Sequence, residues 1–184
     1  MSHEDGSAPT VLVVDDEERA ADTYASVLDA EYDARTAYGG EAALERLAAT
    51  EVDAVLLDRR MPELSGDDVL AAIQRRGIDC RVAMVTAVNP DFDIVELGID
   101  DYMVKPVGKE ALRETVDRLL ALEAYDERQR ELSSLKIKRN VLEIEKPNAA
   151  LSNSEEFARL GARIEELEAE LADMAAELDV PDRR

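Results

Sequence analysis

The chain has 184 residues, of which 43 are acidic and 22 are basic, so its formal net charge is −21 at pH 7. This balance disfavours binding of nucleic acid or of an anionic membrane across the whole surface, because both partners need a basic footprint. A hydrophobic fraction of 46% predicts a folded core, the single cysteine excludes an internal disulfide framework, and no apolar run reaches the roughly 18 residues of a membrane span. We therefore expect a soluble protein of the cytoplasm, without a signal peptide.

Between residues 10 and 124, short apolar runs alternate with amphipathic stretches, after a leader over residues 1–9 that we expect to be disordered. Buried parallel strands have this apolar character, and the stretches between them have helical periodicity. The pattern predicts an α/β fold with a doubly wound, five-stranded parallel sheet, in which the second strand lies near an edge because it contains Arg35. The expected strands are 10–14, 33–37, 54–57, 81–86 and 101–104, and the expected helices are 17–30, 40–49, 66–76, a weak one near 91–98, and 108–124.

Residues 125–184 contain no strand signal and predict an all-α region. Pro147 divides this region into two helices, and Ser152 followed by Glu155 matches a capping box for the start of the second helix. The second helix carries an apolar seam at heptad spacing, which fits a coiled coil, a hairpin with the preceding helix, or both. The seam consists of Leu160, Ile164, Leu167, Leu171, Met174 and Leu178.

Charged and hydroxyl side chains stand at the carboxyl ends of four predicted strands, where doubly wound sheets bind their ligands. Three carboxylates would repel one another there, and a hard divalent cation with oxygen ligands, Mg²⁺, relieves this repulsion. Each residue alone also fits a structural role, such as a helix cap or a surface ion pair with Arg59 or Arg60. Their convergence favours a functional site. The residues are Asp15, Asp16, Asp58, Thr86 and Lys105.

Further short motifs surround these residues. They are the run VLVVDDE at 11–17, Leu57-Asp58, Met61-Pro62, Gly66, Thr86-Ala87, Tyr102 and Lys105-Pro106. Together they resemble a response-regulator receiver domain over residues 10–124, which implies a flavodoxin-like fold. The segment 89–94 departs from the family pattern, because it lacks the Ala- and Gly-rich stretch that is common there.

The resemblance implies a response regulator of a two-component phosphorelay. Asp58 would accept a phosphoryl group from a sensor histidine kinase, which makes the protein a phosphoacceptor with at most slow self-dephosphorylation rather than an enzyme. Mg²⁺ would be held by Asp15, Asp16, Asp58 and the backbone carbonyl of Arg60. The chemistry agrees with these roles, since phosphoryl transfer needs an in-line nucleophile and neutralisation of charge.

The resemblance also implies a switch beside the phosphorylation site. Thr86 would bond a phosphate oxygen in the active state, and Tyr102 would be the aromatic switch residue. Lys105 would pair with the phosphate, and its peptide bond to Pro106 would be cis.

The C-terminal region, residues 125–184, resembles the haloarchaeal HalX domain that follows receivers in a family of regulators. This resemblance implies output through the C-terminal helices, with transcriptional regulation as one form of output. It leaves open a homodimer through the receiver or through these helices. The bases Lys136, Lys138 and Arg139 could contact DNA, but they lie in a region of net charge −5 (15 acidic and 10 basic residues), so a solvated helix face is favoured.

The basic residues are unevenly distributed between their two types, since 17 are arginine and only 5 are lysine. Acid excess with scarce lysine is typical of proteins from cells that hold molar salt. At that concentration the Debye length falls to about 3 Å, which screens repulsion among surface carboxylates. We therefore expect a halophilic protein, with an ordinary acidic protein as the alternative.

Two other functions compete with the signalling switch. One is a phosphatase with an aspartyl nucleophile, but such enzymes have an Asp-x-Asp motif, and this chain has Arg60 two places after Asp58. The other is a coiled-coil scaffold that is never phosphorylated. The complete set of Asp58, Thr86 and Lys105 argues against that scaffold.

Overall fold

The structure, a computed structural model, describes residues 8–90 and 92–178. The chain divides into two compact units between Leu120 and Ala121. The expected leader falls outside the described residues for its first seven positions. Within the described ranges, no helix is both long and apolar enough to cross a membrane.

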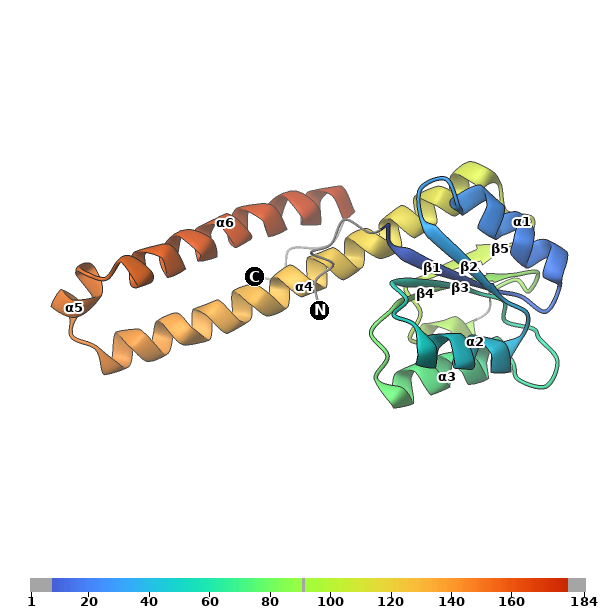
Figure 1. Ribbon diagram of the computed structural model, residues 1–184, viewed down its shortest axis with the longest axis horizontal. Helices are drawn as coiled ribbons and strands as arrows, with labels where there is room; N and C mark the ends of the chain where they lie inside the picture. The colour runs from blue at the N-terminus through green and yellow to red at the C-terminus, as the bar shows by residue number, and fades with distance from the viewer. Residues whose placement is uncertain (1–7, 91, 179–184) are drawn as a thin grey trace. The chain divides into compact units, whose positions relative to one another are not determined.

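The first unit contains a five-stranded parallel sheet in the order β2-β1-β3-β4-β5 (Figure 1). Its strands are β1 (Thr10–Val14), β2 (Asp33–Ala37), β3 (Ala54–Leu57), β4 (Arg81–Thr86) and β5 (Asp101–Val104). The five predicted strands are confirmed, and so is the edge position of β2, where four of the five residues are partly exposed. Strands β1 and β3, by contrast, are buried throughout.

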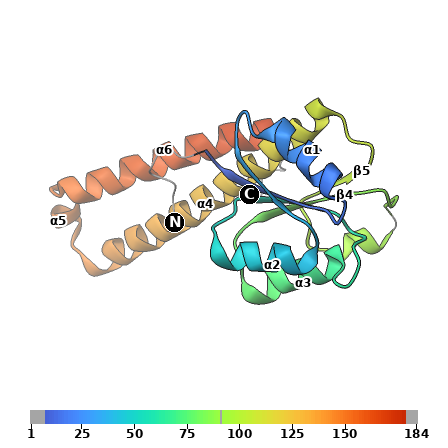
Figure 2. The ribbon, with the colours of Figure 1, turned by 45° about the vertical axis from the view of Figure 1, so that its right-hand side comes forward.

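Helices cover both faces of this sheet. They are α1 (Glu18–Leu28), α2 (Gly40–Ala49), α3 (Gly66–Arg76), the 3₁₀ helix η1 (Phe92–Val95) and the first turns of α4 (Lys109–Glu145). Figure 2 shows α2 and α3 on one face, with α1 and the start of α4 on the other. The helix expected near 91–98 is wrong in type and length, since only the four-residue η1 forms there. The helix expected to end at 124 continues to Glu145.

Alternation along the strands builds the two apolar layers of the first unit. On β1, Leu12 and Val14 join the cluster beneath α2 and α3. Val11 and Val13 join the opposite cluster beneath α1 and the start of α4. This two-residue period is the pleat of the strand, and it fixes the sheet between both helical layers.

The second unit is a helical hairpin made of the remainder of α4, the short α5 (Asn148–Ser152) and α6 (Glu155–Leu178). Figure 1 shows α6 running alongside α4. The middle of the heptad seam, Ile164, Leu167 and Leu171, is buried against Leu132 of α4. The middle of the seam therefore packs within the chain, as expected for a hairpin with the preceding helix.

The start of α6 differs from the predicted capping box. The Ser152 hydroxyl donates to the Asn148 carbonyl at 2.9 Å instead of capping a helix. The Phe157 amide donates to the Ser154 hydroxyl at 3.1 Å, so Ser154 caps α6. The difference arises because the short helix α5 begins after Pro147 and ends at Ser152, so that α6 begins later, at Glu155.

Ion pairs link the two long helices of the hairpin on either side of the seam. Arg163 Nε lies 3.0 Å from Glu131 Oε1, Lys136 Nζ lies 2.7 Å from Glu168 Oε1, and Arg128 Nε lies 2.8 Å from Glu170 Oε2. Exposed pairs of this kind are worth about 0–1 kcal/mol each. They fix the register of the helices more than they stabilise them, and the apolar seam supplies most of the stability.

Candidate functional site

Three carboxylates converge at the carboxyl end of the sheet. Asp15 and Asp16 follow β1, Asp58 follows β3, and one oxygen from each lies within 4.8 Å of the others. The parallel pairing of β1 with β3 sets Val14 opposite Leu57, so the residues after them meet at one edge. Asp15 and Asp58 are buried, whereas Asp16 is exposed, which leaves the cluster open to solvent on one side.

Lys105, which follows β5, binds two of these carboxylates. Its ammonium donates to Asp15 Oδ2 at 2.5 Å and to Asp58 Oδ2 at 3.2 Å. Burial on its own lowers the pKa of Lys105, but the hydrogen bond to Asp15 and the charges of Asp58 and Asp15 together outweigh it and raise the pKa. The lysine is therefore charged at neutral pH, where it offsets part of the negative charge of the cluster.

The backbone holds Asp58 in place from both sides. The Asp58 amide donates to the Val14 carbonyl at 2.9 Å, and the Arg60 amide donates to Asp58 Oδ1 at 3.3 Å. A Cβ on Gly66 would lie 2.3 Å from the Asp58 carbonyl oxygen, so only glycine allows this approach. Ser65 and Asp68 form a capping box that begins α3 at this point.

Thr86 and Tyr102 are joined through the backbone of Val88. The Thr86 hydroxyl accepts a hydrogen bond from the Val88 amide at 3.4 Å, and the Tyr102 hydroxyl donates to the Val88 carbonyl at 2.8 Å. The Lys105 amide also donates to the Thr86 carbonyl at 2.9 Å. The two switch candidates thus share one loop, which begins where β4 ends.

The structure brings the predicted site residues together in two groups. Asp15, Asp16, Asp58 and Lys105 form the charged group, and Thr86 and Tyr102 form the second group around Val88. The Lys105–Pro106 bond is cis, as the resemblance implied. The alternative in which Asp58 forms an ion pair with Arg59 is wrong, because the Arg59 guanidinium binds Asp67 at 3.1 Å.

Two contributors to the site are backbone groups that sequence reasoning missed. One is the Val88 carbonyl, and the other is the Glu17 amide, which donates to Asp15 Oδ1 at 2.9 Å. Neither carries a residue-type signal, because every non-proline residue has the same donor and acceptor.

The donor set fits a magnesium ion. Mg²⁺ prefers oxygen ligands and is held in proteins by one or two carboxylates, with water and phosphate completing its shell. The acid cluster supplies carboxylate oxygens alone, and the exposed Asp16 keeps it open to water and to a phosphate group. The bound Lys105 reduces, but does not remove, the negative charge that attracts such a cation.

A hollow of about 540 Å³ adjoins the residues after β3 and β4. It is lined by Arg59, Arg60, Met61, Ser65, Asp67, Val88 and Asn89. Arg60 and Val88 lie two positions beyond Asp58 and Thr86, respectively. The hollow therefore lies between the segment that follows Asp58 and the Val88 loop.

Comparison with known families identifies both parts of the chain. Residues 11–117 match the response regulator receiver domain, and residues 121–184 match the HalX domain. A putative transcriptional regulator from Haloferax volcanii is 49% identical over 176 residues, which cover 92% of this chain and 30% of that protein. The alkaline phosphatase synthesis transcriptional regulatory protein PhoP from Bacillus subtilis is 35% identical over 114 residues, or 60% of this chain and 48% of that protein.

Solved receiver structures share the fold of the first unit. The response regulator TrrA from Thermotoga maritima, in complex with Mg²⁺ and BeF, has a TM-score of 0.57 at 33% identity and covers 61% of this chain and 99% of its own. The signal receiver domain of a putative LuxO repressor from Vibrio parahaemolyticus has a TM-score of 0.61 at 26% identity. The match covers 65% of this chain and 95% of that one. The chain therefore belongs to the response regulator receiver family, with a HalX domain after its receiver domain.

Proposed function

We propose that this protein is a two-component response regulator in which Asp58 accepts a phosphoryl group from a sensor histidine kinase. The observation that carries the proposal is the junction of three carboxylates with one lysine at the end of the sheet, where Lys105 binds Asp15 and Asp58. The proposed receiver part is residues 10–124, the proposed output part is residues 125–184, and the proposed site of action is the cytoplasm.

The transfer is a simple displacement at phosphorus. An oxygen of the Asp58 carboxylate forms a bond to phosphorus while the bond from phosphorus to the kinase histidine nitrogen breaks, and the imidazole leaves with the electron pair of that bond. The Arg60 amide donates to Asp58 Oδ1 and the Lys105 ammonium donates to Asp58 Oδ2, so these two contacts together orient the carboxylate. Lys105 offsets charge on the transferred group.

We propose that Asp15, Asp16, Asp58 and the Arg60 backbone carbonyl hold Mg²⁺. When bound, Mg²⁺ neutralises charge on the phosphoryl oxygens. The chain's own residues fit that need, since a phosphoryl dianion cannot approach three carboxylates that a single lysine offsets. The related TrrA structure is itself a complex with Mg²⁺ and BeF.

The proposed switch acts through the Val88 loop. Phosphate on Asp58 draws the Thr86 hydroxyl away from the Val88 amide, and the loop then alters the acceptor that holds the Tyr102 hydroxyl. Such a shift stabilises the active arrangement only through bonds that the resting state cannot make.

The proposed output is regulation of transcription through the C-terminal region, since relatives are described as transcriptional regulators. A homodimer would use the receiver face that exposes Phe92 and Val95 more readily than the heptad seam, because the middle of that seam is buried within the chain. Direct contact with DNA has weak support, since Lys136 and Arg139 are already paired with Glu168 and Glu143.

Neither alternative function gains support from the site. A phosphatase of the Asp-x-Asp type needs a second acid where this chain has Arg60, and any hydrolysis would then be slow self-dephosphorylation. A scaffold that is never phosphorylated would have no use for a charged Lys105 bonded to two buried carboxylates.

Intact-mass spectrometry with acetyl phosphate as donor tests the proposal. We expect one added phosphoryl group in the wild type with Mg²⁺, and none in Asp58→Asn, which keeps the size of the side chain but removes the nucleophile. Chelation by EDTA should abolish the gain as well, because the carboxylates then repel the donor. Uptake that persists in Asp58→Asn, or that is equal in EDTA, would contradict the assignment.

A further inference from the structure

Beyond the heptad seam, α4 exposes an apolar stripe. Ile137, Val141 and Ile144 are 64%, 52% and 80% exposed. Their spacing of four and three places them on one face of the helix. Leu132, which lies on the same helix and packs against the seam, is only 7% exposed. α4 thus carries a second apolar stripe, nearer its end, that is largely exposed.

Part of this stripe borders a groove within the second unit. The groove has a volume of about 720 Å³ and lies among the end of α4, α5 and the start of α6. Its apolar lining is Ile137, Val141, Leu142, Leu151, Phe157 and Leu160. An amphipathic helix binds in such a groove through side chains at spacings of three and four.

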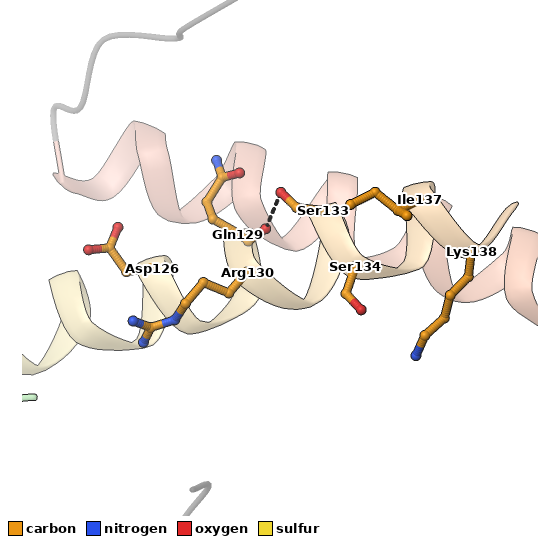
Figure 3. A pocket seen from close by; sticks show the side chains of 7 residues that line it. All are labelled: Asp126, Gln129, Arg130, Ser133, Ser134, Ile137 and Lys138. Carbon is orange, nitrogen blue, oxygen red and sulfur yellow. Dashed lines mark hydrogen bonds between the residues drawn. The ribbon is translucent and has the colours of Figure 1, made fainter. Parts of the chain in front are cut away.

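A second hollow on α4 adjoins this groove and is lined mostly by residues of polar or charged type. Figure 3 shows this adjoining hollow, whose seven side chains all come from α4. Ile137 and Lys138 line both hollows, and the remaining five residues are polar or charged. The large apolar side chains of α5 and α6 that line the groove are Leu151, Phe157 and Leu160, and Lys138 lies at the border between the two hollows.

Charge distinguishes the groove from the rest of the hairpin. Among the residues described in the second unit, Lys138 and Lys146 are the two bases with no ion pair, and both line the groove. The other six bases are paired: Arg128, Arg130, Lys136, Arg139, Arg159 and Arg163. The one acid that lines the groove, Glu156, pairs with Arg159. The groove is thus apolar with two free positive charges, in a chain of net charge −21.

We propose that this groove docks an acidic amphipathic helix of another protein. Its apolar face would cover Val141 and Phe157, and its carboxylates would pair with Lys138 and Lys146. A second copy of the chain fits less well, because a two-fold contact presents the same patch from both sides and would oppose like charges. The proposal goes beyond phosphotransfer at Asp58 and does not depend on it.

Fluorescence anisotropy with the full chain tests this proposal. The probes are two helix-stabilised synthetic peptides with the same leucines at helical spacing and either Glu or Lys at every polar position. We expect the Glu peptide to bind and the Lys peptide to bind far more weakly. The double variant Lys138→Glu/Lys146→Glu should weaken binding of the Glu peptide by about tenfold or more, since it turns two attractions into repulsions. Val141→Asp should weaken it similarly.

A matched control is Lys109→Glu, which makes the same charge change at the start of α4, in the first unit and outside the groove. Its affinity for the Glu peptide should equal that of the wild type. Each variant is compared at a salt concentration at which circular dichroism shows it folded. The proposal is overturned if the Glu peptide does not bind, if both peptides bind equally, or if the charge-reversed variant binds like the wild type. A dimer in sedimentation that Val141→Asp dissociates would assign the groove to a second copy instead.

Discussion

The receiver unit and the helical hairpin use charged residues in different ways. In the receiver, Lys105 pairs with two buried carboxylates at the carboxyl end of the sheet. In the hairpin, charges such as Arg163 and Glu131 lie on exposed helix faces beside an apolar seam. Burying a charge is costly unless it is paired and hydrogen-bonded, whereas exposed pairs contribute little free energy. The comparison shows why residue types reveal the function of the first unit but not of the second.

Replacing one fully buried leucine by alanine in each unit should show whether the two units unfold independently. Leu56 of β3 and Leu167 of α6 are 1% and 0% exposed, and each Leu→Ala change should cost about 2–5 kcal/mol. We expect Leu56→Ala to lower the temperature at which Asp58 still takes up phosphoryl groups. Leu167→Ala should instead reduce helical content while leaving that uptake unchanged. Equal loss of uptake in both variants would show that the units unfold together.

Replacing one glycine by alanine in each unit should change their stabilities in opposite directions. A Cβ at Gly66 would lie 2.3 Å from the Asp58 carbonyl, so Gly66→Ala should destabilise the receiver and slow phosphoryl uptake. A Cβ at Gly161, inside α6, meets nothing within 4 Å. Gly161→Ala should therefore stabilise the hairpin by about 0.5–1 kcal/mol, because alanine favours the helix. Urea unfolding measures both, and a stable Gly66→Ala variant with normal uptake would refute the close approach.

Salt should stabilise the whole chain while weakening the pairs on the hairpin. With a net charge of −21, surface carboxylates repel across the Debye length of about 10 Å at 0.1 M salt, and molar salt screens this repulsion. We expect the melting temperature to rise by several degrees between dilute buffer and molar potassium chloride. Calorimetry in both buffers checks this, and an unchanged melting temperature would remove the halophilic interpretation.

The smallest expected effect is a pH dependence from the Lys136–Glu168 pair. The hydrogen bond from Lys136 lowers the pKa of Glu168. Because the folded-state pKa lies below the unfolded one, the contribution is present above the unfolded pKa and is lost as pH falls through the folded pKa. Lys136→Met should therefore reduce hairpin stability slightly at pH 7 and leave it unchanged in acid. A titration of Glu168 by nuclear magnetic resonance, with the same pKa in both proteins, would contradict this.

Local patterns in the sequence were sufficient for most of the receiver fold. All five strands have the predicted bounds, because buried parallel strands are short apolar runs that turn residues delimit. The meeting of Asp15, Asp16, Asp58 and Lys105 follows from the same reasoning, since the ends of parallel strands share one edge. The segment near 91–98 was predicted less well, because its weak periodicity could not distinguish a helix from the short η1.

What the sequence by itself determined is therefore the set of strands, the parallel sheet and the chemistry-bearing residues at its edge. Only the tertiary structure decided which groups those residues meet: Arg59 binds Asp67 rather than Asp58, and Tyr102 binds the Val88 carbonyl. It also decided that Ile164, Leu167 and Leu171 pack against α4 of the same chain. The physical reason is that periodicity reports which face of an element is apolar or charged, whereas the partner of that face depends on where the rest of the chain lies in space.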